Sequence, residues 1–237
     1  MVAELAAGLK KYARKAFSGV KYFTSFIFQR KTIVLLCTKV KIAHTKGGFR
    51  VQEYTTNVGE ITGVYKSVAR YNNYPGTDDD ARTASRLRHG MKYYAAYEGD
   101  KVIAYLWLHS VSPRFFDEVG IYLRHGPNDL WLRDVYVVPD KRGQGVFGSV
   151  INAVIREYYP AARHLYSDVM ADNGPSLKAH RNLGMAVMGR VRFTRILRRI
   201  LFREVHAEGL EAYGYKSPQR ILFMDDNYFA FVNSNRC

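Results

Sequence analysis

The sequence predicts an α/β (α+β) protein in which helices flank a mixed β-sheet, and three observations support this class. Short apolar runs rich in β-branched and aromatic residues alternate with segments whose apolar residues recur every three or four positions. The elements follow the order βα(α)ββ–βαβαββ, which implies an α/β layer with a mixed sheet. The chain of 237 residues, with 47% hydrophobic content, is also long enough to bury a core without disulfides.

Residues 1–48 are expected to form a basic N-terminal extension of the main domain. Apolar residues recur at steps of three and four over residues 2–20, which predicts an amphipathic helix with its basic residues mostly on the other face. Such a helix can lie on a membrane surface, or it can pack its apolar stripe on the domain core. Residues 25–42 are interpreted as two strands on either side of the polar positions 29–31.

The main domain is expected over residues 49–206, and apolar periodicity and loop residues predict each of its elements. A strand over residues 50–55 is followed by a helix over residues 57–71, whose apolar residues lie on one side. An acidic loop can cap a second helix. The remaining expected elements are that helix at 81–89, a hairpin at 93–110, strands at 130–138 and 164–171, helices at 147–158 and 175–183 with Gly184 as a C-terminal cap, strands at 189–196 and 200–206, and a C-terminal extension at 207–237 that packs on the domain.

The composition narrows the partners and the compartment. The net charge of +15 is concentrated in residues 1–50, which hold 8 Lys and 3 Arg against one acid, Glu4. This balance favours acidic partners, although a solvated basic face that keeps the protein soluble explains it equally well. The two cysteines, Cys37 and Cys237, form no disulfide framework or metal cluster, which indicates a reducing compartment. Since no apolar run approaches the length of a membrane span, we expect a cytoplasmic protein that is at most peripheral at the membrane.

A glycine-rich loop between a predicted strand and a predicted helix indicates an anion-binding site. Gly143 and Gly145 let the backbone turn and expose its N–H groups, and Arg142 adds a charge. The helix that follows contributes unpaired N–H donors and the positive end of its dipole. Residues 138–141 separate the strand from the glycines, which argues against a dinucleotide-binding pattern, and no Gly-Lys-Ser/Thr follows. The remaining alternative is a plain structural turn.

Two motifs in this region resemble the GNAT acetyltransferase superfamily, in particular its diamine and small-amine acetyltransferases. LRDVYVVPDKRGQGVFGSVI resembles the coenzyme-binding segment, where a strand of the form D-x-Y-V-x-P leads into (Q/R)-x-x-G-x-(G/A) and a helix. DVMADNGPSLKAHRNLGM resembles the next strand, its Asn, and a short helix that ends in Leu-Gly-Phe. The resemblance covers about residues 49–206. It implies a mostly antiparallel central sheet flanked by helices.

The resemblance also implies a co-substrate, acetyl-CoA or a longer acyl-CoA. Backbone groups of the strand would face the thioester and the pantetheine arm, and the loop N–H groups would bind the pyrophosphate. Asn173 and Ser176 would contact the pantetheine or the adenosine. Because the family prefers Gly or Ala at position 147, Phe147 either points into the core, as we expect, or intrudes on the ligand. The expected coenzyme-binding residues are Val135, Tyr136, Val137, Arg142, Gly143, Gln144, Gly145, Val146, Phe147, Gly148, Asn173 and Ser176.

Transfer of an acyl group from a thioester to an amine needs a neutral amine, donors for the oxyanion and a proton for the leaving thiolate. The related amine acetyltransferases supply that proton from a Tyr on the helix after the Asn. His180 stands seven residues after Asn173 and is the candidate catalytic residue, since a histidine can protonate a thiolate. The alternative is a surface helical histidine without a role.

The acceptor site is less well defined. The usual acid on the strand is replaced by Arg133, which cannot act as a base but could bind an anionic acceptor or a phosphate. Strand alternation places Asp134 on the face opposite Arg133, and we interpret Asp134 as structural. His109, Arg192 and, more weakly, Glu118 are further candidates for contact with the acceptor. A plain solvated face explains the arginines around Arg192 equally well.

The sequence therefore predicts an acyl-CoA-dependent N-acyltransferase that transfers an acyl group, acetyl before longer chains, directly to an amine in a ternary complex. Direct transfer is expected because no nucleophilic Cys or Ser motif is visible. The alternative is a non-catalytic GNAT-like protein that binds anionic lipid, acyl carrier protein or nucleic acid through its basic surface. The expected partners are a coenzyme A thioester and an amine-bearing acceptor. An anionic membrane surface, an acidic acyl carrier protein and a homodimer stay open, while nucleic acid and metal are not expected.

Overall fold

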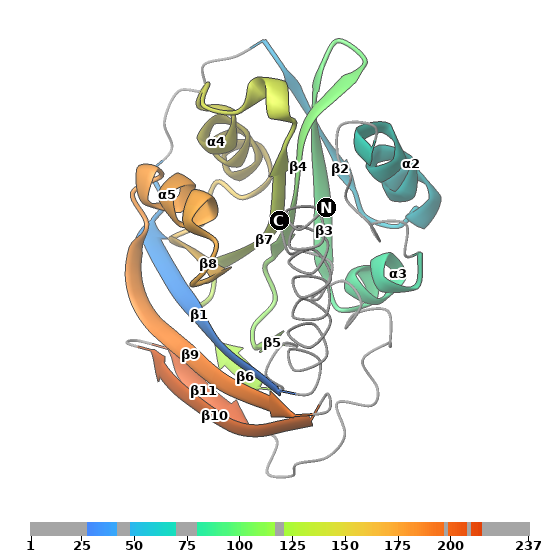
Figure 1. Ribbon diagram of the computed structural model, residues 1–237. Coiled ribbons are helices and arrows are strands. Elements are labelled where there is room, and N and C mark those ends of the chain that lie inside the picture. Colours follow the sequence, from blue (N-terminus) through green and yellow to red (C-terminus); the bar gives the residue numbers. More distant parts are fainter. Residues whose placement is uncertain are drawn as a thin grey trace, which may run out of the picture.

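The computed structural model describes residues 28–41, 48–69, 80–116, 121–196, 199–207 and 210–214. The amphipathic helix expected over residues 2–20 and residues 215–237 of the C-terminal extension lie outside these ranges. The described residues form an eight-stranded sheet in the order β10-β9-β1-β8-β7-β4-β3-β2 and a three-stranded sheet in the order β11-β6-β5 (Figure 1).

The expected mixed, mostly antiparallel sheet is confirmed, since β7 and β8 form the parallel pair and the other described pairs are antiparallel. The elements fall close to their expected positions where the apolar pattern is long. The strands are β1 (Phe28–Lys39), β2 (Arg50–Tyr54), β3 (Met91–Glu98), β4 (Lys101–His109), β5 (Arg114–Phe116), β6 (Ile121–Arg124), β7 (Leu130–Val137), β8 (His164–Met170), β9 (Ala186–Ile196), β10 (Arg199–Ala207) and β11 (Glu211–Gly214), and the helices are α2 (Val58–Ala69), α3 (Asp80–Arg88), α4 (Val146–Tyr158) and α5 (Gly174–Asn182).

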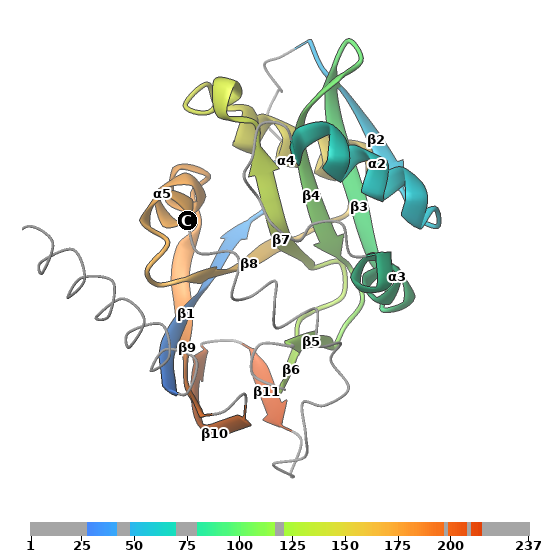
Figure 2. The same ribbon diagram turned by 45° about the vertical axis from the view of Figure 1, so that its right-hand side comes forward.

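The helices cover both faces of the large sheet. Figure 2 shows α2 and α3 in front of β3 and β4, with α4 behind them. Helix α2 begins after Asn57, whose Oδ1 accepts a hydrogen bond from the Glu60 backbone N–H at 3.2 Å while its amide donates to the Glu60 carboxylate at 2.9 Å. This cap satisfies the Glu60 N–H at the start of the helix, and the second bond joins the two side chains. The helix then buries Ile61, Tyr65 and their apolar neighbours against the sheet.

Strand β1 corrects one expectation. We expected two strands on either side of positions 29–31, but one strand runs continuously over Phe28–Lys39. It pairs with β9 along its length, and with β8 from Ile33 onward. The polar residues therefore lie where β1 extends past β8, and pairing with β9 alone keeps them extended. The boundary expected at residue 48 does not separate this strand from the sheet, because β1 is an interior strand.

The small sheet was not expected from the sequence. Strands β5 and β6 pair with each other, and β11 of the C-terminal extension pairs with β6. Ile121 and Leu123 of β6 share a buried cluster with Ile33, Trp131 and other residues of the large sheet. The small sheet thus lies against the large one. Within the described ranges, no helix is long and apolar enough to cross a membrane.

Candidate active site

The parallel strands β7 and β8 separate after a short paired stretch. They pair over only three positions, from Leu130 with Leu165 to Leu132 with Ser167. β7 continues to Val137 along β4, while β8 turns toward β1 (Figures 1 and 2). In the described part of the chain, the β8 side of β7 therefore lacks a paired strand beyond Leu132. We call this place the β7–β8 divergence.

Backbone groups of β7 are directed into this divergence. The Val138 N–H donates to the Ile103 carbonyl on β4 at 3.0 Å. Because the groups of successive strand residues alternate in direction, those of Val137 and Val135 point away from β4. Arg142 confirms this geometry, since its Nε–H donates to the Val137 carbonyl at 3.0 Å. The strand can thus offer peptide groups to an amide-bearing ligand.

A bulge in β7 lies at the start of the divergence. Between paired positions, β4 advances from Tyr105 to Trp107 while β7 advances from Arg133 to Tyr136, so β7 carries one extra residue. Asp134 lies in this bulge with a φ of 44°, in the left-handed region. Sequence analysis missed the bulge because alternation alone contains no sign of it.

The bulge overturns the expected placement of Asp134. Its carboxylate forms an ion pair with buried Arg86 of α3, and that guanidinium lies over the Trp107 ring at 5.2 Å. Trp107 is in turn the strand partner of Arg133, which is buried. Asp134 therefore reaches the face covered by α3 rather than the opposite one, because the extra residue breaks the alternation. Its ion pair with a buried arginine agrees with a structural role.

The glycine loop forms a turn that ends at the start of α4. A short 3₁₀ helix over Pro139–Lys141 leads into it, and Gly143 and Gly145 have φ values of 75° and 77°. Glycine adopts this left-handed region without the penalty that a side chain brings. The Ser149 N–H donates to the Gly145 carbonyl at 3.1 Å, and the helix start has no side-chain cap among the described residues.

This start leaves backbone donors for a ligand. The N–H groups of Val146, Phe147 and Gly148 precede the first intrahelical bond of α4 and lie at the positive end of its dipole. The loop side chains are meanwhile held by protein groups: Gln144 donates to the Asp140 carbonyl at 2.6 Å, and the Arg142 guanidinium lies 5.5 Å from the Tyr136 ring. The geometry suits an anion such as a pyrophosphate.

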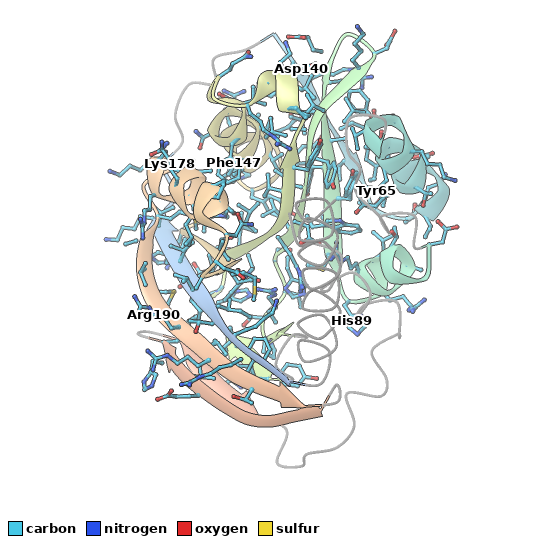
Figure 3. All side chains as sticks on the ribbon, viewed as in Figure 1. Tyr65, His89, Asp140, Phe147, Lys178 and Arg190 are labelled. Atoms are coloured by element: carbon cyan, nitrogen blue, oxygen red, sulfur yellow. The ribbon has the colours of Figure 1, made fainter. Side chains whose placement is uncertain are left out.

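Phe147 lies between α4 and α5, where Figure 3 labels it. Its ring is half-buried and meets the His180 ring edge-on, with centroids 5.0 Å apart and an angle of 61°. A Cβ on neighbouring Gly148 would lie 3.3 Å from a side-chain carbon of Leu183, the residue that caps the C-terminus of α5. At position 148, α4 therefore comes close to the end of α5. Phe147, in turn, covers one side of the His180 ring.

Asn173 and Ser176 shape the start of α5. Asn173 is the N-cap, and its Oδ1 accepts a hydrogen bond from the Ser176 N–H at 3.2 Å. Asn173 is exposed and Ser176 is half-buried, and their contact with a coenzyme stays a prediction. The capping bond supplies a second, structural reason for an Asn at this position.

His180 is buried on α5, so the alternative of a surface histidine is wrong. Only 4% of the residue is exposed. Its Nδ1 lies 2.7 Å from the Ser176 carbonyl oxygen, and its Nε2 lies 2.9 Å from the Ser167 hydroxyl on β8. Burial lowers the pKa of His180, and the hydrogen bond to the Ser176 carbonyl opposes this shift.

Of the other candidate acceptor residues, His109 lies near Arg133, and besides burial the charge of Arg133 also lowers the pKa of His109, whereas Arg192 lies apart from both. His109 is buried, and its Nε2 lies 3.0 Å from the His89 carbonyl oxygen. Burial, with the nearby Arg114 charge, lowers the pKa of His109 to about 4. Arg192 is exposed on β9, 3.6 Å from Glu204, and β1 and β8 lie between β9 and β7 in the sheet. Glu118 lies outside the described residues.

Two polar groups near the divergence were missed, one of them buried. Ser167 is 2% exposed and faces α5, and Asp168 accepts hydrogen bonds from Arg114 and from the Trp131 indole, both at 2.6 Å. The available signal was a Ser-Asp pair inside an otherwise apolar strand. In the described ranges, no group of three His, Cys, Asp or Glu residues could hold a metal ion.

Comparison with known proteins places this arrangement in a family. The model of the acetyltransferase (GNAT) family matches residues 50–185, from β2 to the end of α5 and more than half of the chain. The chain belongs to the GNAT acetyltransferase family. No curated protein matches it.

Several solved structures resemble the fold at low identity. One is a putative GNAT-family acetyltransferase from Novosphingobium aromaticivorans, with 17% identity and a TM-score of 0.46 over 70% of this chain and 63% of that chain. Another is a GCN5-related N-acetyltransferase from Sphaerobacter thermophilus, with 15% identity and a TM-score of 0.49 over 77% and 57%. A third is the aminoglycoside N-acetyltransferase AAC(6')-Iy in complex with CoA, with 18% identity and a TM-score of 0.40 over 57% and 90%. The chain thus spans about three fifths of the first two proteins.

Proposed function

We propose that the protein is an acyl-CoA-dependent N-acyltransferase, with acetyl-CoA as the first donor to test. The observation that carries the proposal is the β7–β8 divergence beside the loop at Gly143 and Gly145. The unpaired edge of β7 is followed along the chain by the start of α4, which has no side-chain cap. Together they match the two polar parts of a coenzyme A thioester, its amide-bearing arm and its pyrophosphate. Family membership supports the same assignment.

The chain's own groups have separate roles in this proposal. The backbone groups of Val135 and Val137 pair with the pantetheine amides, much as another strand would. The N–H groups of residues 146–148 bind the pyrophosphate, because that helix start has no side-chain cap. The bulge at Asp134 changes the direction of the strand where the thioester would lie.

The reaction is direct transfer from the thioester to an amine in a ternary complex. The acceptor is a small amine or diamine, as the two sequence motifs suggest. In this proposal, backbone N–H groups of the β7 bulge stabilise the developing oxyanion, and buried His180 contacts Ser167 at the last paired position of β7 and β8. No part of this scheme needs a metal.

Coenzyme binding is tested by thermal unfolding with acetyl-CoA, longer acyl-CoA and free CoA. A ligand at about 100 times its Kd stabilises the folded state by about 2.7 kcal/mol, which raises the Tm of a chain of this size by roughly 5–10 °C. Gly145→Ala should reduce the shift, because alanine at a φ of 77° strains the turn although its Cβ would meet no atom within 4 Å. Gly63→Ala on α2 has the same open space without positive φ and serves as the control. The lack of a shift with every CoA compound would overturn the proposal.

Transfer is tested by following CoA thiol release with a panel of amines that includes putrescine, spermidine, an aminoglycoside and an amino sugar. Acetylation of at least one amine, seen by mass spectrometry, is expected. Initial rates over both substrates should give intersecting lines in double-reciprocal plots, as a ternary complex requires. Parallel lines would show a covalent intermediate and contradict direct transfer.

A further inference from the structure

The hydrogen bonds of His180 keep its ring away from direct contact with an acyl donor. One nitrogen, Nδ1, donates to the Ser176 carbonyl at 2.7 Å, and the other, Nε2, lies 2.9 Å from the Ser167 hydroxyl. Phe147 also covers one side of the ring, which it meets edge-on. A proton that His180 exchanges with a substrate must therefore pass through one of these partners.

Ser167 is the partner that reaches the β7–β8 divergence. Its hydroxyl lies 3.4 Å from the Leu132 carbonyl oxygen, and this pair of residues is the last one at which β7 and β8 are in register. The Ser176 carbonyl, in contrast, lies on α5 and can only accept hydrogen bonds. A second hydroxyl, Ser176 Oγ, lies 3.4 Å from Nδ1, but it belongs to α5. Among the described partners of His180, Ser167 is therefore the hydroxyl on β8 that lies at the place assigned to the thioester.

The hydrogen-bond directions also decide the state of the pair. Because a carbonyl can only accept, Nδ1 carries the proton, and Nε2 of the neutral ring has a lone pair. The Ser167 O–H then donates to Nε2. Burial lowers the pKa of His180, which favours this neutral ring at pH 7. The ring is thus set to accept a proton from the serine first and to return it afterwards.

We propose that Ser167 relays protons between the reacting atoms and His180. This rests on the proposed function. As the amine nitrogen bonds to the thioester carbon, it gives a proton to Ser167 Oγ, while the serine's own proton moves to His180 Nε2. When the C–S bond breaks, the thiolate takes a proton from Ser167 Oγ, which regains one from Nε2. The products are the amide and the CoA thiol, and neither residue is changed at the end.

In this scheme Ser167 is the catalytic residue, and His180 acts through it as a positioning and proton-storing residue. The competing interpretation is that the Ser167–His180 bond only fastens α5 to β8. The two interpretations differ in measurable ways. A fastening bond affects stability, whereas a relay affects kcat and the response of the imidazole to the substrate.

The first experiment measures kcat and KM with the best amine of the panel. Ser167→Ala should lower kcat on the order of 100-fold, the usual contribution of general acid–base catalysis, while the Kd of acetyl-CoA stays within about twofold. Ser167→Thr keeps the hydroxyl and should recover most of kcat. Ser67→Ala removes an exposed hydroxyl on α2 that donates to the Val64 carbonyl, and it should match the wild type. A folded Ser167→Ala variant with wild-type kcat would overturn the relay.

The second experiment needs no acceptor. Nitrogen-15 NMR of the His180 ring, assigned with His180→Gln, is recorded with CoA and with desulfo-CoA, which lacks the thiol. A working relay predicts that Nε2 responds as the bound CoA thiol is deprotonated with rising pH. It predicts no such response with desulfo-CoA or in Ser167→Ala. Equal responses to the two coenzymes in the wild type would contradict the relay.

Together the experiments separate the two proposals. A thiol-dependent Nε2 response without acetylation of any amine would show that the Ser167–His180 pair senses the bound thiol, but it would remove the proposed function and with it the relay that rests on it. Amine acetylation that Ser167→Ala leaves unchanged supports the proposed function and removes the relay. Failure of CoA to bind removes both.

Discussion

His109 illustrates how a single buried residue couples stability to pH. Its Nε2–H donates to the His89 carbonyl, and its Nδ1 is buried without a hydrogen-bond partner among the described residues. The folded protein therefore holds a neutral imidazole, with a pKa lowered to about 4 by burial and the Arg114 charge. In the unfolded chain the ring has an ordinary pKa near 6.5.

The sign of the pH effect follows directly. Below pH 6.5 the unfolded chain binds a proton that the folded protein excludes, so stability is complete above pH 6.5 and is lost as pH falls toward 4. We expect a loss of about 2–3 kcal/mol from this residue between pH 7.5 and 4.5. Urea unfolding at both pH values measures the loss, and His109→Gln should reduce it. The pKa of His180 is also lowered, so His180 adds to the loss of stability at low pH in the wild type and in His109→Gln alike. An unchanged slope in His109→Gln would contradict the assignment.

At the scale of elements, the pairing of β9 with β10 depends on one glycine. A Cβ on Gly189 would lie 2.2 Å from the His206 carbonyl oxygen and 2.7 Å from the Ala207 Cα, both backbone atoms of β10. Backbone atoms cannot move aside without breaking the strand pair. We expect Gly189→Ala to lower the free energy of unfolding by about 3 kcal/mol, the upper end of the cost of overpacking.

The matched control for that substitution is Gly63→Ala. Gly63 lies on the exposed side of α2, and a Cβ there would meet no atom within 4 Å. Alanine restricts the unfolded chain and favours a helix, so this variant should gain about 0.5–1 kcal/mol. Urea unfolding of both variants tests the pair. Destabilisation by Gly63→Ala, or none by Gly189→Ala, would show that the local packing differs from that described.

The elements also show what the sequence can predict. Helix α4 was expected over residues 147–158 and runs over Val146–Tyr158, because a long apolar periodicity defines it. The glycine loop was also recognisable from the sequence, because glycine is the residue that adopts positive φ without a penalty. Both glycines do have positive φ in the structure. Strands β5 and β6 have three and four residues, too few for a visible period. Ser167 was missed because its contact with His180 depends on how β8 and α5 pack, which no local pattern encodes.

At the scale of the whole molecule, β1 joins an early segment of the chain to β8 and β9, which lie more than 120 residues later. Ile33 and Leu35 are 1% and 0% exposed, and β1 pairs with β8 on one side and β9 on the other. A chain that begins at residue 49, where sequence reasoning placed the domain, lacks this strand. It leaves two strand edges and the apolar cluster around Trp131 open to solvent.

We therefore expect the chain that begins at residue 49 to aggregate or to unfold without cooperativity. Circular dichroism during heating and size-exclusion chromatography measure this outcome. A synthetic peptide of residues 28–41 added during refolding should restore part of the folded signal, since it supplies the missing strand. A cooperative transition in the shortened chain alone would mean that β8 and β9 can close on each other without β1.

The position of β1 also has a consequence for the synthesis of the protein. Ile33 pairs with Val191, which leaves the ribosome roughly 160 residues later. At ordinary translation rates the first strand waits on the order of ten seconds for its partners. During that time IVLLC, an apolar segment at positions 33–37, lacks its β9 partner, and its partners on β8 are also made late. Chaperones that hold emerging apolar segments would therefore have a natural target in residues 33–37 during synthesis.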